Sequence, residues 1–134
     1  LFIKKLLKHE QPIINGDGSN SRDFTYIDNI ININMLALET LSPKAFNQIY
    51  NGAGGENTSV LELEQMIRKK ISVYDKDIKH IAPMFGPKRI GDIKHSKASI
   101  SKAKELLGYS PVCTFEYGLR QTIDWYCTNL KGKI

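Results

Sequence analysis

The sequence predicts an α/β fold made of helices with a few short strands. Apolar residues recur every three or four positions in several segments, and short β-branched runs bounded by turn residues lie between them. The chain has 134 residues, of which 41% are hydrophobic and 25% are charged. This size and composition are typical of one globular domain with its own core. They exclude a collagen-like or broadly disordered chain.

The first third predicts a short helix, two extended segments and a longer helix. Residues 2–9 have helical spacing, and Pro12 to Asn15 predict a strand that ends in a turn over residues 16–20. Residues 24–27 are aromatic and β-branched, which favours a second extended segment. Asp28 can cap the helix that follows. The stripe expected to face the core is formed by Ile27, Ile31, Met35 and Leu38.

A third strand is predicted over residues 46–51, followed by a glycine-rich turn over residues 52–55. Ser59 and Glu62 form a capping box for the next helix. Glu64 and Arg68 are spaced to form an ion pair on the outer face of that helix.

The last third predicts a long loop and two helices. Residues 75–96 are irregular, and a loop of this length in a compact domain often binds a ligand. A short helix is predicted to begin at Ser99 or Ser101 and to end at Gly108, because glycine is favoured at the C-cap. Thr114 caps the last helix.

Several functional classes are excluded by composition and spacing. The 19 Lys and Arg residues exceed the 14 Asp and Glu residues and give a net charge of +5, but the lysines are spread over predicted helix faces. We therefore expect no nucleic-acid partner. No apolar run is long enough for a membrane span, and the three histidines lack the spacing of metal ligands. We expect no membrane partner and no metal.

The glycine-rich turn over residues 52–55 matches a dinucleotide-binding fingerprint only in part. That fingerprint requires glycine at its first, third and sixth positions, and the sixth position here is Asn57. A plain strand-to-helix turn is favoured, and we expect no cofactor on this chain.

Two arginines outside the predicted helices are candidate binding residues. Arg22 follows the turn over residues 16–20, and Arg89 lies in the long loop. A guanidinium group presents paired donors to phosphate oxygens, so two of them could clamp a diphosphate. Asp92 could accept both hydroxyls of a ribose. The alternative is that Arg22 pairs with Asp23 or Asp28, and Arg89 with Asp92, as surface ion pairs.

Four ordered motifs resemble those of extended short-chain dehydrogenases/reductases that act on nucleotide sugars, the NAD-dependent epimerase/dehydratase family. They span residues 16–28, 49–59, 89–96 and 102–111. Within that family, residues 27–29 and 95–96 are most similar to those of UDP-N-acetylglucosamine 4-epimerases.

The resemblance implies a role for each matching residue. Arg22 and Arg89 would bind the diphosphate of a UDP-sugar, and Asp92 would bind the uridine ribose. Asn15 would lie beside the uracil. Ser96 matches a position where a small side chain leaves room for an N-acetyl group.

The resemblance also implies what residues 1–134 would lack. The NAD fingerprint and the catalytic Tyr-x-x-x-Lys belong to a dinucleotide-binding half, and neither motif occurs in this sequence. Residues 1–134 would be a single domain, the C-terminal substrate-binding lobe of such an enzyme without its Rossmann half. By itself this chain would have no catalytic activity. NAD would bind to the absent half, which would be its partner in a cytoplasmic enzyme that could form a homodimer.

Two alternatives stay open. One is another reaction of the same family: UDP-glucose 4-epimerisation, 4,6-dehydration or decarboxylation. The other is a non-catalytic module that binds nucleotide sugars.

Overall fold

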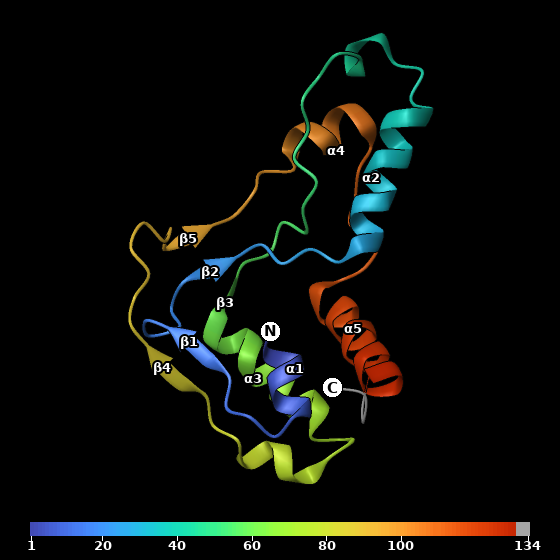
Figure 1. The fold of residues 1–134 in the computed structure, drawn as a ribbon. Helices are drawn as coiled ribbons and strands as arrows, with labels where there is room; N and C mark the ends of the chain where they lie inside the picture. Colours follow the sequence, from blue (N-terminus) through green and yellow to red (C-terminus); the bar gives the residue numbers. More distant parts are fainter. Residues whose placement is uncertain (131–134) are drawn as a thin grey trace. The chain divides into compact units, whose positions relative to one another are not determined.

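The computed structural model describes residues 1–130 and shows an α/β chain in which helices hold most of the regular structure (Figure 1). The chain divides into two compact units. Among the described residues, unit 1 contains residues 1–22, 58–95 and 119–130, and unit 2 contains residues 23–57 and 96–118. The assignment of residues 1–134 to one domain stays a prediction.

Unit 1 combines short strands with helices α1 (Phe2–Leu7) and α3 (Val60–Ile71), which contact each other. Strand β1 (Ile13–Asn15) pairs in parallel with β4 (Met84–Gly86). In a second sheet, β2 (Ser21–Arg22) lies between β3 (Thr58–Ser59) and β5 (His95–Ser96). The 3-10 helix η2 (Lys76–His80) precedes β4. Fully buried side chains in this unit include Leu6, Ile14, Ile71, Ile78 and Ile123.

The capping box predicted for α3 is confirmed. The amide of Glu62 donates to Oγ of Ser59 at 3.1 Å, and the amide of Ser59 donates to Oε2 of Glu62 at 2.8 Å. The ion pair between Arg68 and Glu64 also forms, with Nε 3.0 Å from Oε1. It is not on the outer face, because Glu64 is fully buried.

Unit 2 contains helices α2 (Ile27–Glu39) and α4 (Ser101–Leu107) and the 3-10 helix η1 (Pro43–Ala45). Tyr109 is buried in its core, where the hydroxyl donates to the carbonyl of Ala53 at 2.8 Å. Gly108 ends α4 with φ +67°, as its residue type predicts. Helix α5 (Phe115–Leu130) begins in this unit after Thr114, whose Oγ1 accepts from the amide of Tyr117 at 3.2 Å, and from Leu119 onward its residues belong to unit 1.

Two backbone predictions for unit 2 are wrong. Residues 46–51 form no strand, because Asn47 adopts the left-handed region with φ 55° and interrupts an extended backbone. Residues 24–26 also form no strand, and α2 begins at Ile27 with Tyr26 rather than Asp28 at its N-cap.

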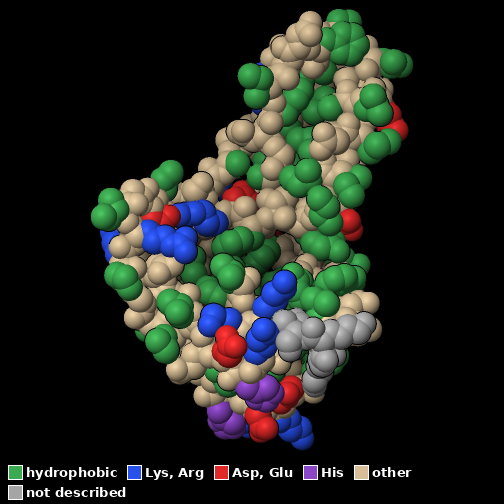
Figure 2. Space-filling view, viewed as in Figure 1, with side chains coloured by type: hydrophobic (Ala, Val, Ile, Leu, Met, Phe, Trp, Pro, Cys, Tyr) green, Lys and Arg blue, Asp and Glu red, His purple; other side chains and the backbone are tan. Residues whose placement is uncertain are grey.

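The predicted inward stripe of α2 is exposed instead. Its four members are between 44% and 78% exposed: Ile27, Ile31, Met35 and Leu38. Figure 2 shows hydrophobic side chains at the surface in the region of this helix. Helix α2 has apolar residues on two faces, and Ile33 and Leu36 are the ones that pack into the core of unit 2. The periodicity identified the helix but could not decide between its two apolar faces.

Candidate functional site

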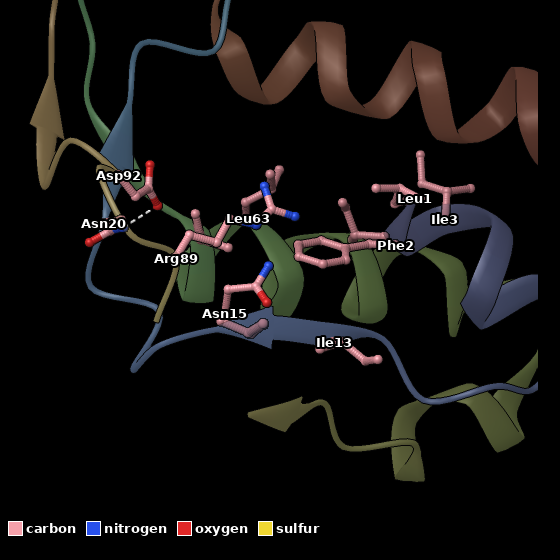
Figure 3. A pocket seen from close by; sticks show the side chains of 12 residues that line it. Leu1, Phe2, Ile3, Ile13, Asn15, Asn20, Leu63, Arg89 and Asp92 are labelled. Atoms are coloured by element: carbon pink, nitrogen blue, oxygen red, sulfur yellow. Dashed lines mark hydrogen bonds between the residues drawn. The ribbon is translucent and has the colours of Figure 1, made fainter. Parts of the chain in front are cut away.

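A pocket of about 350 Å³ lies in unit 1 (Figure 3). This volume is at the lower end of the range for small-molecule sites. The polar lining residues gather toward one end, and apolar residues of α1 lie toward the other. The polar group is Asn15, Asn20, Arg89 and Asp92. The apolar group is Leu1, Phe2, Ile3, Ile13, Ile14, Val60, Leu63 and Ile67.

Parallel pairing of β1 with β4 brings Arg89 to the pocket. Asn15 is paired with Gly86, so the chain that leaves β4 passes the end of β1 and reaches Arg89 three residues later. With its amide oxygen turned toward the guanidinium, Asn15 accepts from Nε of Arg89 at 2.9 Å and from Nη2 at 3.1 Å. This contact holds an otherwise exposed arginine at the pocket.

Asp92 is held by two residues from the β2 region. Its Oδ1 accepts from Nη2 of Arg22 at 2.5 Å, and its Oδ2 accepts from Nδ2 of Asn20 at 2.6 Å. Arg22 also donates from Nη1 to the carbonyl of Ser21 at 2.7 Å. The carboxylate is therefore oriented by the protein before any ligand is present.

The turn between β1 and β2 requires glycine. Gly18 adopts φ +76°, and a Cβ there would lie 2.9 Å from Cβ of Leu61. Asp17 closes the turn, with its Oδ1 accepting from the amide of Ser19 at 2.9 Å and from its hydroxyl at 2.7 Å. These hydrogen bonds lower the pKa of Asp17. The turn fixes the spacing between Asn15 and Asn20.

The structure brings four of the five predicted site residues together in unit 1: Asn15, Arg89, Asp92 and Arg22. The alternative ion pairs, Arg22 with Asp23 or Asp28 and Arg89 with Asp92, do not form in the described part of the chain. Arg22 instead pairs with Asp92, and Arg89 contacts Asn15. The fifth residue, Ser96, is the last residue of β5 and belongs to unit 2, where it is exposed.

Asn20 is the site residue that the sequence did not reveal. It is 72 residues from Asp92 in the chain, and it belongs to a segment that had been predicted only as a turn. The available signal was its position two residues before Arg22, because alternate residues of a strand face the same side.

The glycine-rich turn over residues 52–55 does not fit a dinucleotide. The amides of Gly54 and Gly55 donate to the carboxylate of Asp23 at 3.1 and 3.0 Å, so these donors already have an anionic partner. Within residues 1–130, no cluster of at least three His, Cys, Asp or Glu side chains is placed to bind a metal. In the same residues, no helix has the length and hydropathy required to cross a bilayer.

Comparison with known proteins adds family relationships to this geometry. Residues 1–122 match the family model described as GDP-mannose 4,6 dehydratase. A putative UDP-glucose 4-epimerase of Methanocaldococcus jannaschii is 33% identical in an alignment that covers 96% of this chain and 38% of the relative.

Two solved structures have a similar fold. The UDP-N-acetylglucosamine 4-epimerase from Methanobrevibacter ruminantium, in complex with UDP-N-acetylmuramic acid, has a TM-score of 0.81 at 33% identity, over 95% of this chain and 38% of its own. The UDP-glucuronic acid 4-epimerase from Bacillus cereus, in complex with UDP-glucuronic acid and NAD, has a TM-score of 0.79 at 33% identity over the same shares. The chain thus spans 38% of the length of each of these relatives.

Proposed function

Because the chain belongs to the GDP-mannose 4,6-dehydratase family of extended short-chain dehydrogenases/reductases, we propose that the pocket of unit 1 binds the nucleotide of a UDP-sugar. The observation that carries this proposal is the convergence of Asn15, Arg89 and Asp92 on one pocket, with Arg22 bonded to Asp92. Asn15 and Arg22 lie in or beside the motif over residues 16–28, and Arg89 and Asp92 lie in the motif over residues 89–96. Their side-chain chemistry suits the parts of a nucleoside diphosphate.

The N–H donors of Arg89 and Arg22 that make no hydrogen bond within residues 1–130 support this assignment. A guanidinium has five N–H donors, and Asn15 accepts from two of those on Arg89, so three remain for phosphate oxygens. Arg22 likewise uses two donors, one to Asp92 and one to a backbone carbonyl. The apolar walls of the pocket offer a surface for a flat base, with the Asn15 amide beside it.

The finer proposal is that the chain is the substrate-binding portion of a UDP-N-acetylhexosamine 4-epimerase, which interconverts UDP-GlcNAc and UDP-GalNAc. The small side chain of Ser96 and the likeness to the M. ruminantium enzyme support this substrate. Epimerases of other UDP-sugars and decarboxylases are also among the relatives, so another reaction of the family is the second candidate. Assays of the complete enzyme with UDP-GlcNAc, UDP-glucose and UDP-glucuronic acid would separate these reactions.

The larger part of each relative lies outside the matched region, and we assign to that part NAD and the transient C4 oxidation that NAD supplies. The residues of this chain would bind and orient the nucleotide, which positions the sugar without performing chemistry on it. The exposed stripe of α2 is the surface that we propose for packing against that dinucleotide-binding part. A purified 134-residue chain is then expected to show no epimerase activity.

Calorimetry tests the proposed function. We expect the chain to bind UDP and UDP-GlcNAc and to show no binding of a DNA oligomer at physiological salt. If UDP gives no heat of binding and DNA binds with a steep dependence on salt, the net positive charge of the chain serves nucleic-acid binding and the proposed function is wrong.

A further inference from the structure

Both oxygens of the Asp92 carboxylate have a separate donor. Arg22 holds Oδ1 and Asn20 holds Oδ2, at 2.5 and 2.6 Å. Both distances are short, as expected where one partner is ionised. The side chain of Asp92 is 28% exposed, so one side of the carboxylate is covered and the other reaches the pocket.

The two donors come from alternate positions around Ser21. Asn20 and Arg22 therefore emerge on one face of the β2 segment, and Ser21 points to the other. There its hydroxyl lies 2.8 Å from Nδ1 of His95, and its amide donates to the carbonyl of Lys94 at 2.8 Å. Asn20 is only 9% exposed, and its carbonyl accepts from the amide of Val60 at 2.9 Å. The backbone that carries the side chains of Asn20 and Arg22 is thus fixed by hydrogen bonds.

A carboxylate held in this way can accept two further hydrogen bonds in a defined plane. An ionised carboxylate offers about four acceptor positions, and the two inner donors leave about one on each oxygen. Two adjacent hydroxyl groups match this arrangement, whereas a single hydroxyl would leave one oxygen without its partner. The terminal torsion of an aspartate is otherwise broad, so the inner donors decide its plane.

We propose that Asn20 is a positioning residue that, together with Arg22, fixes the plane of Asp92 and thereby makes the pocket select a ribose over a 2′-deoxyribose. The inference rests on the proposed function, since it assumes that the pocket holds a uridine nucleotide. It adds a source of sugar selectivity that acts through Asp92. It also gives Arg22 a role at the ribose beside any contact with the diphosphate.

The experiment compares UDP, 2′-deoxy-UDP and inorganic pyrophosphate by calorimetry on the 134-residue chain. The parent is expected to prefer UDP over 2′-deoxy-UDP by about tenfold, the equivalent of one hydrogen bond to a charged group. In Asn20→Ala this preference should fall below about threefold while pyrophosphate affinity stays unchanged. Asn20→Asp removes the amide donors without creating a cavity and should lose the preference as well. Asn34→Ala, at an exposed position of α2, is the matched control.

The outcomes separate the two proposals. Full ribose preference in Asn20→Ala overturns the positioning role and leaves the nucleotide site intact. Equal losses for UDP, 2′-deoxy-UDP and pyrophosphate, with a lowered melting temperature, overturn it in favour of a structural role. A parent chain that binds none of the three ligands overturns the proposed function, and the positioning role with it.

Discussion

Arg22 and Asp92 are 70 residues apart in the chain and form a salt bridge with Nη2 2.5 Å from Oδ1. Their side chains are 30% and 28% exposed, so the pair is neither fully solvated nor buried. The short strand β2 and the loop after β4 are joined at this point, beside the pocket that Asp92 lines. The ion pair therefore connects the backbone scaffold to the proposed ribose contact.

Replacing either arginine should weaken UDP binding. Arg22→Ala and Arg89→Ala are each expected to cost about 1.5–3 kcal/mol, the range for hydrogen bonds to charged groups. Calorimetry with UDP measures the loss, and Lys69→Ala on the exposed face of α3 is the charge-matched control. Parental affinity in both arginine variants would remove the proposed clamp.

Asn15 should act on UDP binding through Arg89. Asn15→Ala removes the acceptor that holds Nε and Nη2 of the guanidinium, so the arginine must be ordered by the ligand itself. A double-mutant cycle with Arg89→Ala is expected to give a coupling energy of about 1 kcal/mol in UDP affinity. Strictly additive losses would mean that Asn15 contacts the nucleotide independently of Arg89.

Arg68 should contribute to stability through its buried partner. Arg68→Ala leaves the fully buried carboxylate of Glu64 without its guanidinium and is expected to cost about 3 kcal/mol of unfolding free energy. Urea unfolding measures this cost. The double variant Glu64→Leu with Arg68→Leu should recover much of it, because no buried charge is left unpaired. A loss below about 0.5 kcal/mol in Arg68→Ala would contradict the buried ion pair.

The capping box of α3 should make this helix sensitive to acid. Hydrogen bonds from the backbone and side chain of Ser59 lower the pKa of Glu62. A carboxylate whose pKa is lowered on folding contributes stability above its unfolded pKa, and this contribution disappears as the pH falls through the folded pKa. In Ser59→Ala the pKa of Glu62 should rise part of the way toward its ordinary value in an NMR titration, because the hydroxyl donor is removed while the backbone amide donor of residue 59 remains. Ser72→Ala, at the C-cap of α3, should leave it unchanged.

The outward stripe of α2 should govern association with the dinucleotide-binding part. Ile31→Asp combined with Met35→Asp places two charges on an exposed apolar face and should abolish copurification with the proposed dinucleotide-binding part supplied as a separate polypeptide. Asn34→Asp adds a charge to the same helix and serves as the control. Copurification that survives the double substitution would assign the contact to another surface.

Local signals predicted the elements that depend on neighbouring residues. The capping box at Ser59 and the C-cap at Gly108 act within one turn of helix, and both are present. The strand predicted over residues 46–51 failed because one left-handed residue, Asn47, interrupts it. The orientation of α2 could not be predicted, because which of its two apolar faces is covered depends on residues far away in the chain.

The candidate site shows the same division. Arg89 and Asp92 could be selected from the sequence because a guanidinium suits phosphate and a carboxylate suits ribose hydroxyls, and because both lie in a motif, residues 89–96, that resembles one of the family. Asn20 did not stand out, because its significance depends on a carboxylate 72 residues later. The bond between Asn15 and Arg89 likewise depends on the parallel pairing of β1 with β4, which no local pattern specifies.

The turn at Gly18 contributes both to the pocket and to the packing of α3. A larger residue at position 18 would displace Leu61, which belongs to the first turn of α3. The amide of Leu61 donates to the carbonyl of Gly18 at 3.1 Å. Enlarging Gly18 would move the start of a scaffold helix and tilt the two asparagines that flank the turn. Nucleotide recognition and helix packing would then change together, so an evolving sequence has little freedom to retune one without disturbing the other.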